Sequence, residues 1–130
     1  MSGGHRRFRR LAAADDGAVL VEYAFVLPVL LMLVFGLMQL GGMAWTQAGL
    51  DFAVQEAARC AVVRPDLCRD DPGIKAYAAS QAAGLSVPAG AFSVTRPACG
   101  VQVSASLKYA FMVSPFGSAP ATLTAAVCAS

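Results

Sequence analysis

The longest apolar stretch of the chain predicts one long helix near the N-terminus. Residues 23–50 contain no Asp, Glu, Lys or Arg, and residues 23–38 are almost entirely apolar. A helix over the charge-free stretch is about 40 Å long at 1.5 Å per residue, more than the ~30 Å thickness of a bilayer's hydrocarbon layer. The pattern therefore predicts a transmembrane helix over residues 18–45.

Two alternatives for this stretch are a cleaved secretory signal and the core helix of a soluble protein. A secretory signal has a shorter apolar core that ends in small residues at a cleavage site. Here the apolar run continues into residues 41–48, where Trp45 suits the outer membrane interface. A chain of 130 residues offers little protein to cover a helix that is apolar all round. We therefore favour a retained membrane span.

Beyond the span, the pattern predicts a stalk helix over residues 46–64. Small side chains recur there at every fourth position, at Gly49, Ala53, Ala57 and Ala61. Small residues let another element approach the helix backbone, and we favour a globular part folded onto this stripe over a partner helix. Asp51, Glu56 and Arg59 make the opposite face polar. Pro65 ends the helix, since the residue before a proline is disfavoured in helical geometry.

The remaining residues, 65–130, predict a small head that contains one helix and one sheet. Residues 72–83 predict a short helix with Gly84 as its stop. Residues 101–109 alternate between apolar and polar, which marks a half-buried strand. Antiparallel partner strands and their connecting turns are expected on either side, with strands at 91–96 and 121–127 and turns at 97–100 and 114–120. The predicted fold class is α+β: a long N-terminal helix, then a head with one short helix and a three-stranded antiparallel sheet.

Composition and charge exclude two classes of protein. Hydrophobic residues make up 57% of the chain and charged residues only 14%, against roughly 25% charged residues in soluble domains. A disordered chain and a basic nucleic-acid binder are both disfavoured. The net charge of +2 belongs to residues 1–17, which contain four arginines and two aspartates, while the later residues carry equal numbers of basic and acidic side chains. The positive-inside tendency places this leader in the cytoplasm and the head outside.

Glu22 does not fit a plain membrane anchor. It lies within the first turns of the apolar segment, where a carboxylate costs roughly 2.5 to 3.5 kcal/mol at the bilayer centre and less near the edge. It can snorkel to the interface, but its neighbours indicate a second role. Gly17, four apolar residues and Glu22-Tyr23 together resemble the G-xxxx-E-Y processing site of Flp-type prepilins and TadE-like pseudopilins. The basic leader, the run around Pro28 and residues 55–63 also resemble the TadE-like domain.

The resemblance implies a minor pseudopilin of a tight adherence (Flp, type IVb) pilus system in the bacterial inner membrane. It implies that a prepilin peptidase cuts between Gly17 and Ala18. The implied partners are that peptidase, other pilins and pseudopilins, pilus assembly platform proteins and the lipid bilayer. The cut creates an amine on Ala18, and positions i and i+4 of a helix share one face, so this amine can pair with Glu22 of the same chain or of a neighbour.

The four cysteines, Cys60, Cys68, Cys99 and Cys128, all fall on the predicted outer side of the membrane. An even number of cysteines in an oxidising compartment is typical of disulfides. Three pairings are possible, and sequence order favours Cys60 with Cys68 and Cys99 with Cys128. The alternation of strand residues opposes the second pair unless Gly100 resets the phase with a bulge. A zinc site is the alternative, disfavoured because there is no C-x-x-C and the single histidine, His5, lies in the leader.

The residue inventory argues against an enzyme. No histidine outside the leader is available as a base for a nucleophile, and no glycine-rich loop with Lys-Ser or Lys-Thr is present. The acidic residues 66, 70 and 71 favour a solvated loop over a metal site. We expect no cofactor, no metal, no nucleic acid and no small-molecule substrate. Two other functions stay open: an uncleaved single-pass scaffold whose head binds another envelope protein, and a secreted disulfide domain released by signal peptidase.

Overall fold

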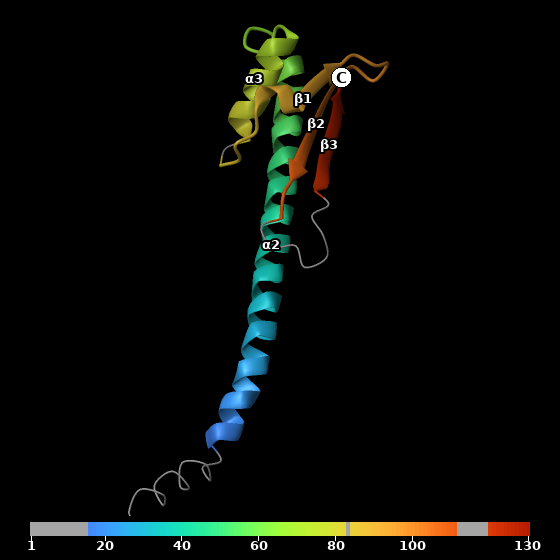
Figure 1. The fold of residues 1–130 in the computed structure, drawn as a ribbon. Helices are drawn as coiled ribbons and strands as arrows, with labels where there is room; N and C mark the ends of the chain where they lie inside the picture. Colours follow the sequence, from blue (N-terminus) through green and yellow to red (C-terminus); the bar gives the residue numbers. More distant parts are fainter. Residues whose placement is uncertain (1–15, 83, 112–119) are drawn as a thin grey trace, which may run out of the picture. The chain divides into compact units, whose positions relative to one another are not determined.

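The computed structural model of the chain describes residues 16–82, 84–111 and 120–130. Figure 1 shows the order of the elements, which are helix α2 (Asp16–Val63), helix α3 (Asp71–Gln81), the 3-10 turn η1 (Ala89–Ala91) and strands β1 (Phe92–Thr95), β2 (Val101–Tyr109) and β3 (Ala121–Ala129). The predicted α+β fold class is confirmed. The leader up to residue 15 and all but the last residue of the turn predicted at 114–120 lie outside the described residues.

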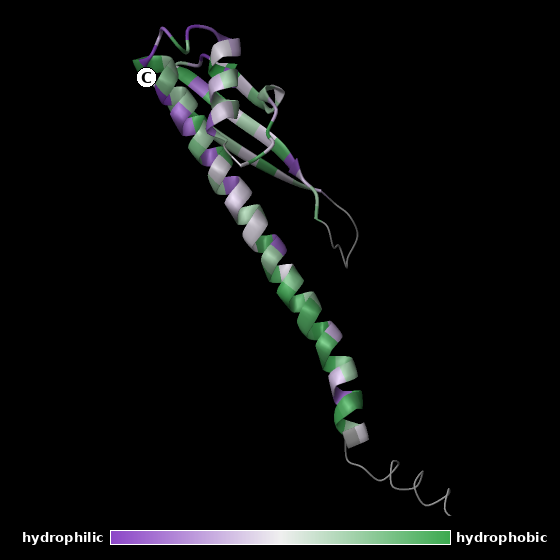
Figure 2. Ribbon diagram, turned by 90° about the vertical axis from the view of Figure 1, so that its left-hand side faces the viewer, coloured by the Kyte–Doolittle hydropathy of each residue, from purple (hydrophilic) through white to green (hydrophobic). Residues whose placement is uncertain are grey.

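The chain divides into two compact units between Met38 and Gln39. In the first unit the described residues all belong to α2, which continues through Pro28. Every large apolar side chain from Val19 to Met38 exposes between 40 and 75% of its surface. Figure 2 shows how strongly hydrophobic this part of the helix is. Such a helix lacks the covered stripe of a soluble helix, and by length and composition it can cross a membrane.

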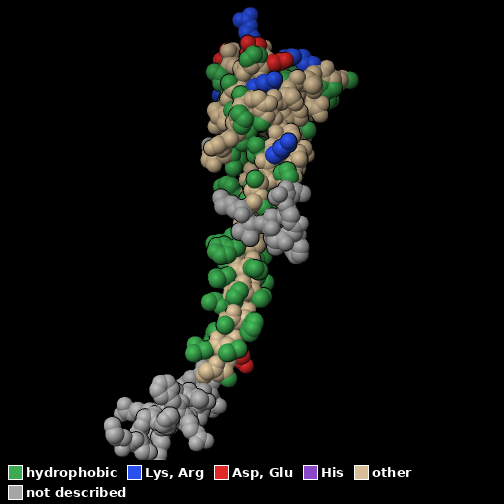
Figure 3. Space-filling view, in the orientation of Figure 1, with side chains coloured by type: hydrophobic (Ala, Val, Ile, Leu, Met, Phe, Trp, Pro, Cys, Tyr) green, Lys and Arg blue, Asp and Glu red, His purple; other side chains and the backbone are tan. Residues whose placement is uncertain are grey.

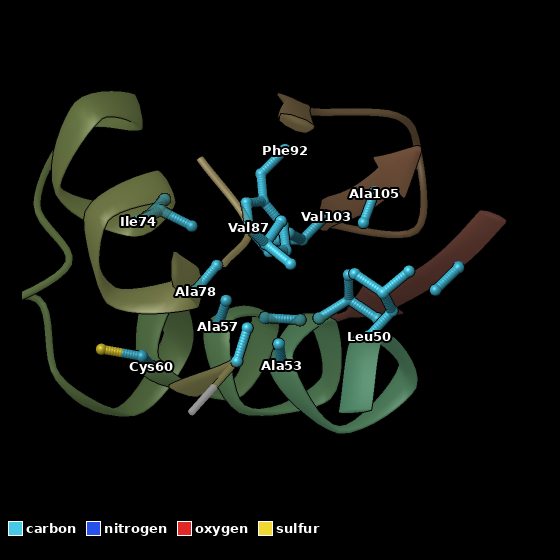
Figure 4. Close-up of a cluster of buried hydrophobic side chains, with 14 of the residues drawn as sticks. Leu50, Ala53, Ala57, Cys60, Ile74, Ala78, Val87, Phe92, Val103 and Ala105 are labelled. Atoms are coloured by element: carbon cyan, nitrogen blue, oxygen red, sulfur yellow. The ribbon is translucent and has the colours of Figure 1, made fainter. Parts of the chain in front are cut away.

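In the second unit, α2 buries one face under the head. Leu50, Ala53, Val54, Ala57 and Ala58 have no exposed surface, and their spacing of three and four residues places them on one helical stripe. Figure 4 shows how the stripe meets side chains of the other elements. The core is completed by residues of α3 and all three strands, namely Ile74, Ala78, Phe92, Val103, Ala105, Leu123 and Ala125. The head therefore folds onto the small-residue stripe, as the sequence predicts.

The outward face of α2 in this unit is not uniformly polar, contrary to the sequence-based expectation. Trp45 is 74% exposed and Phe52 is 53% exposed, alongside the exposed Arg59. The expectation was wrong because it considered only the charged positions. Spacing of seven residues places the two aromatic side chains on the same side of the helix, so this face carries apolar as well as polar surface.

The sheet has the order β1-β2-β3 with both pairs antiparallel. Val103 of β2 lies between Val94 and Val127 in the register, and Val103 is fully buried. The strands differ from the predicted bounds at three points, the first being that β1 ends at Thr95 and not at Arg96. The 3-10 turn occupies Ala91, so β1 begins one residue later, and β3 extends to Ala129, which pairs with Val101.

The acidic loop before α3 has a structural role that goes beyond solvation. The Asp70 carboxylate accepts a hydrogen bond from the Gly73 amide at 2.9 Å and caps the helix N-terminus. Asp71 forms an ion pair of 2.7 Å with Arg96, just after β1. The expectation of a solvated loop holds for its exposure, and two of its three carboxylates in addition make these specific contacts. Both groups join α3 to its surroundings.

Both expected disulfides are formed. Cys60 pairs with Cys68 across the end of α2, with 5.8 Å between their Cα atoms, and Cys99 pairs with Cys128 at 6.3 Å. The phase difficulty disappears because Cys99 precedes β2, in a turn closed by a hydrogen bond from the Gly100 amide to the Pro97 carbonyl. Gly100 has a φ of +117°, and a Cβ there would overlap the Ala129 carbonyl oxygen. A turn that requires glycine resets the phase, where a bulge was expected.

Candidate processing and assembly site

The four residues of the predicted processing motif lie in the first two turns of α2. Gly17 is the second residue of this helix, followed by Ala18, and Glu22 and Tyr23 come one turn later. All four are exposed.

Gly17 has no role in packing that the structure reveals. A Cβ built at Gly17 would have no heavy atom within 4 Å, and Gly17 does not have the positive φ that is found at Gly84 and Gly100. Glycine inside a helix costs roughly 0.5–1 kcal/mol relative to alanine. Packing and backbone conformation among the described residues therefore do not require glycine at this position.

Glu22 is a carboxylate on an otherwise apolar helix surface. Val19 and Val26, three residues before and four residues after Glu22, lie on the same helix face. Within residues 16–82, 84–111 and 120–130 no cation and no hydrogen-bond donor contacts Glu22. Figure 3 shows the hydrophobic side chains that line this part of the helix. A charged group in such surroundings gains from any partner cation that reaches it.

Ala18 is the position from which such a cation can be supplied. It precedes Glu22 by four residues in a continuous helix, which places both on one face about one turn apart. An α-amino group on Ala18 would therefore lie within reach of the Glu22 carboxylate. The motif can thus present either a peptide bond to a protease or, after cleavage, a paired amine and carboxylate.

The described residues of the head offer no comparable chemical site. Its four cysteine sulfurs are joined in disulfides and are not available as zinc ligands. In the part of the chain that the structure describes, no group of three or more His, Cys, Asp or Glu side chains could hold a metal ion. A groove of about 270 Å³ at the end of α2 is lined by exposed charged side chains and Tyr77.

The structure also joins residues that sequence reasoning left unconnected. Tyr109, at the end of β2, lies over Gly42 of α2, where a Cβ would come within 2.9 Å of the tyrosine hydroxyl. The Phe111 ring contacts the Tyr109 ring edge-on, with 5.3 Å between the ring centroids. The alternation of residues 101–109 indicated a strand but not where its end lies on the helix. The one available signal was a pair of aromatic residues at the end of an apolar strand.

Helix α2 is long and apolar enough to cross a membrane, which suggests membrane anchoring, and the α+β head carries two disulfides. The family model described as TadE-like protein matches residues 17–59, from Gly17 into the part of α2 that the head covers. The chain is TadE-like over this segment, and the resemblance predicted from the sequence is confirmed. The match covers about a third of the chain and stops before α3. No curated protein and no solved structure matches the chain.

Proposed function

We propose that this protein is a TadE-like minor pseudopilin that takes part in assembly of a tight adherence pilus. In this proposal the chain inserts into the inner membrane with its N-terminus in the cytoplasm. A prepilin peptidase removes residues 1–17, and the mature protein, beginning at Ala18, joins other pilins or pseudopilins and the pilus assembly platform. The broadest part of this proposal, that the chain is a membrane protein associated with a Tad pilus, is supported by the family match.

The observation that carries the proposal is the unexplained glycine at the start of an exposed apolar helix. Gly17 is the first residue of the TadE-like segment, it contacts nothing that would forbid a side chain, and it immediately precedes Ala18. A peptidase that must approach the backbone closely benefits from a residue without a side chain. Glycine at this position therefore makes sense as part of a recognised peptide bond.

Cleavage would also supply a partner for Glu22. The new Ala18 amine and the Glu22 carboxylate are each costly next to lipid, and pairing reduces the cost of both. If the pair forms between neighbouring chains, it fixes how far one helix is displaced along the next. Glu22 is then an assembly residue, and Tyr23 beside it completes the recognition motif.

The test is the mass and N-terminal sequence of the membrane-extracted protein, with and without a cognate prepilin peptidase. We expect a chain that starts at Ala18 only when the peptidase is active. Gly17→Val should block the cut. Gly36→Val is the matched control, since Gly36 lies in the same helix and is equally uncrowded, and this variant should still be cut because Gly36 is far from the cleaved bond. An intact leader in the presence of active peptidase would contradict the proposal and favour an uncleaved scaffold. A cut after the apolar stretch would indicate a secreted domain.

A second arm of this experiment separates processing from assembly. Glu22→Gln should still be cleaved but should fail to enter the pilus fraction, because the Ala18 amine loses its carboxylate. Glu56→Gln, in the second unit, is the matched control and should assemble normally. Normal incorporation of the Glu22 variant would show that the charge is dispensable.

A further inference from the structure

Three aromatic residues from distant parts of the sequence meet at one level of α2 in the second unit. Trp45 lies on α2 itself and is 74% exposed. Tyr109 places its hydroxyl against Gly42, less than one turn before Trp45, and Phe111 packs edge-on against Tyr109. The aromatic groups thus come from the helix and from the end of β2, and they lie near the same short stretch of helix.

This stretch is where the hydrocarbon layer should end. About 20 helical residues cross the hydrocarbon of a bilayer. If Glu22 marks the cytoplasmic edge, the opposite edge falls near Gly42. The next charged residue of α2 is Asp51, two turns or more beyond that point. The level of Gly42 and Trp45 is therefore the outer boundary between acyl chains and headgroups.

The side chains at this level have the chemistry of that boundary. Tryptophan and tyrosine are enriched at membrane interfaces because each combines an apolar ring with a polar tip. Phe111 is partly buried. Lys108, next to Tyr109, is exposed and, like other interfacial lysines, can lay its apolar stem along lipid and place its ammonium among headgroup phosphates. Tyr109 lies at the opposite end of β2 from Gln102, the residue that pairs with Thr95 beside Arg96.

We propose that this end of the head, the segment Lys108–Phe111, rests in the headgroup layer of the bilayer together with Trp45. The head would then dock on the lipid surface along one end of its sheet, which limits how it can tilt about α2. The inference rests on the proposed membrane span, because Gly42 marks the interface only if α2 crosses the bilayer.

The single tryptophan of the chain makes the test direct. The full chain is reconstituted into vesicles of phosphatidylcholine and phosphatidylglycerol, with bromine atoms placed either near the carbonyl ends or near the methyl ends of the acyl chains. Trp45 should lose about half of its emission with shallow bromines and less with deep ones, as expected for an interfacial indole. In a Trp45→Phe background, Phe111→Trp should show the same preference for the shallow bromines.

Two control variants in the same background define the absence of lipid contact. Phe52→Trp reports on an exposed position two turns further along α2. Thr95→Trp reports on an exposed position opposite Gln102, at the other end of the sheet. The nine residues of β2 separate that end from Tyr109 by roughly 26 Å at 3.3 Å per residue. Neither control should be quenched by either lipid.

The outcomes distinguish the inference from the proposed span. If Trp45 is quenched while Phe111→Trp behaves like Thr95→Trp, the head does not touch lipid and the inference is overturned, with the span intact. If Trp45 itself escapes both lipids, the span is wrong. Should Phe111→Trp fail to fold, Tyr109→Trp provides the same readout from the neighbouring ring. Quenching of Phe111→Trp or of Tyr109→Trp by the shallow bromines, without quenching of the two control variants, supports the docking.

Discussion

The apolar side chains of helix α2 are exposed in one stretch of the helix and buried in the other. From Val19 to Met38 every large apolar side chain is at least 40% exposed, whereas Leu50 and Val54 are completely buried beneath the sheet and α3. Both stretches belong to one uninterrupted helix, so backbone geometry does not explain the difference. The cover does. The second stretch is covered by its own chain, whereas the first has no cover among the described residues.

This contrast shows which side chains act in folding and which act in anchoring. Deleting a buried side chain costs the transfer free energy of its atoms and leaves a cavity. The same deletion on a surface that faces lipid leaves no cavity, because lipid chains fill the space. Equivalent substitutions in the two stretches should therefore have different consequences for the stability of the head.

The largest contrast is expected for phenylalanine. Phe92 is 1% exposed in the head core. Phe92→Ala should lower the free energy of unfolding of the head by about 3–5 kcal/mol. Phe35→Ala, at a 52% exposed position of the span, should leave the unfolding of the head unchanged. Denaturant titration of the detergent-solubilised protein, followed by protease cleavage of the head, measures both. Equal losses would mean that the two stretches are not independent in stability.

The disulfides provide the next largest effect. Cys99–Cys128 closes a longer loop than Cys60–Cys68, with sequence separations of 29 and 8. Chain-entropy arguments predict losses of about 3.5 kcal/mol and about 2.5 kcal/mol when each pair is replaced by alanines. Membrane retention after carbonate extraction should be unaffected in both variants. The reverse order of the two losses, measured by the same denaturant titration, would show that loop length does not set their contribution.

The smallest effect lies at the boundary between the two stretches, where two adjacent glycines differ. A Cβ at Gly41 would meet nothing within 4 Å, but one at Gly42 would lie 2.9 Å from the Tyr109 hydroxyl. Gly41→Ala should stabilise the helix by about 0.5–1 kcal/mol. Gly42→Ala should gain less, since the tyrosine ring must shift. Identical midpoints in thermal unfolding of the two variants would argue against the contact of Tyr109 with the helix.

Much of this fold can be predicted from the sequence because apolar residues recur at regular intervals and because proline marks the end of a helix. The alternation from Val101 to Tyr109 matches β2 residue for residue, and Pro65 follows the last turn of α2 closely. The small residues at 53 and 57 predict a covered face, and that face is covered. The processing motif, Gly17 with Glu22 and Tyr23, depends on local spacing alone and so needs no tertiary information.

What the sequence could not predict depends on contacts between distant segments. The ion pair of Asp71 with Arg96 and the contact of Tyr109 with Gly42 each join residues from different parts of the chain. No periodicity within one segment encodes such a meeting. The pairing of Cys99 also seemed out of phase, because strand alternation was carried across a turn whose glycine has a positive φ. Local patterns determine elements, and side-chain shape determines where they touch.

Gln47 has a consequence that reaches beyond the single chain. Its side-chain Nε2 donates to the Thr124 carbonyl at 2.9 Å and also contacts the Asp51 carboxylate at 3.2 Å. Strand β3 is an outer strand of nine residues with no charged side chain, the type of edge onto which a foreign strand readily adds. By occupying the Thr124 carbonyl, the helix side chain removes from that edge one of the acceptors to which a foreign strand would bond.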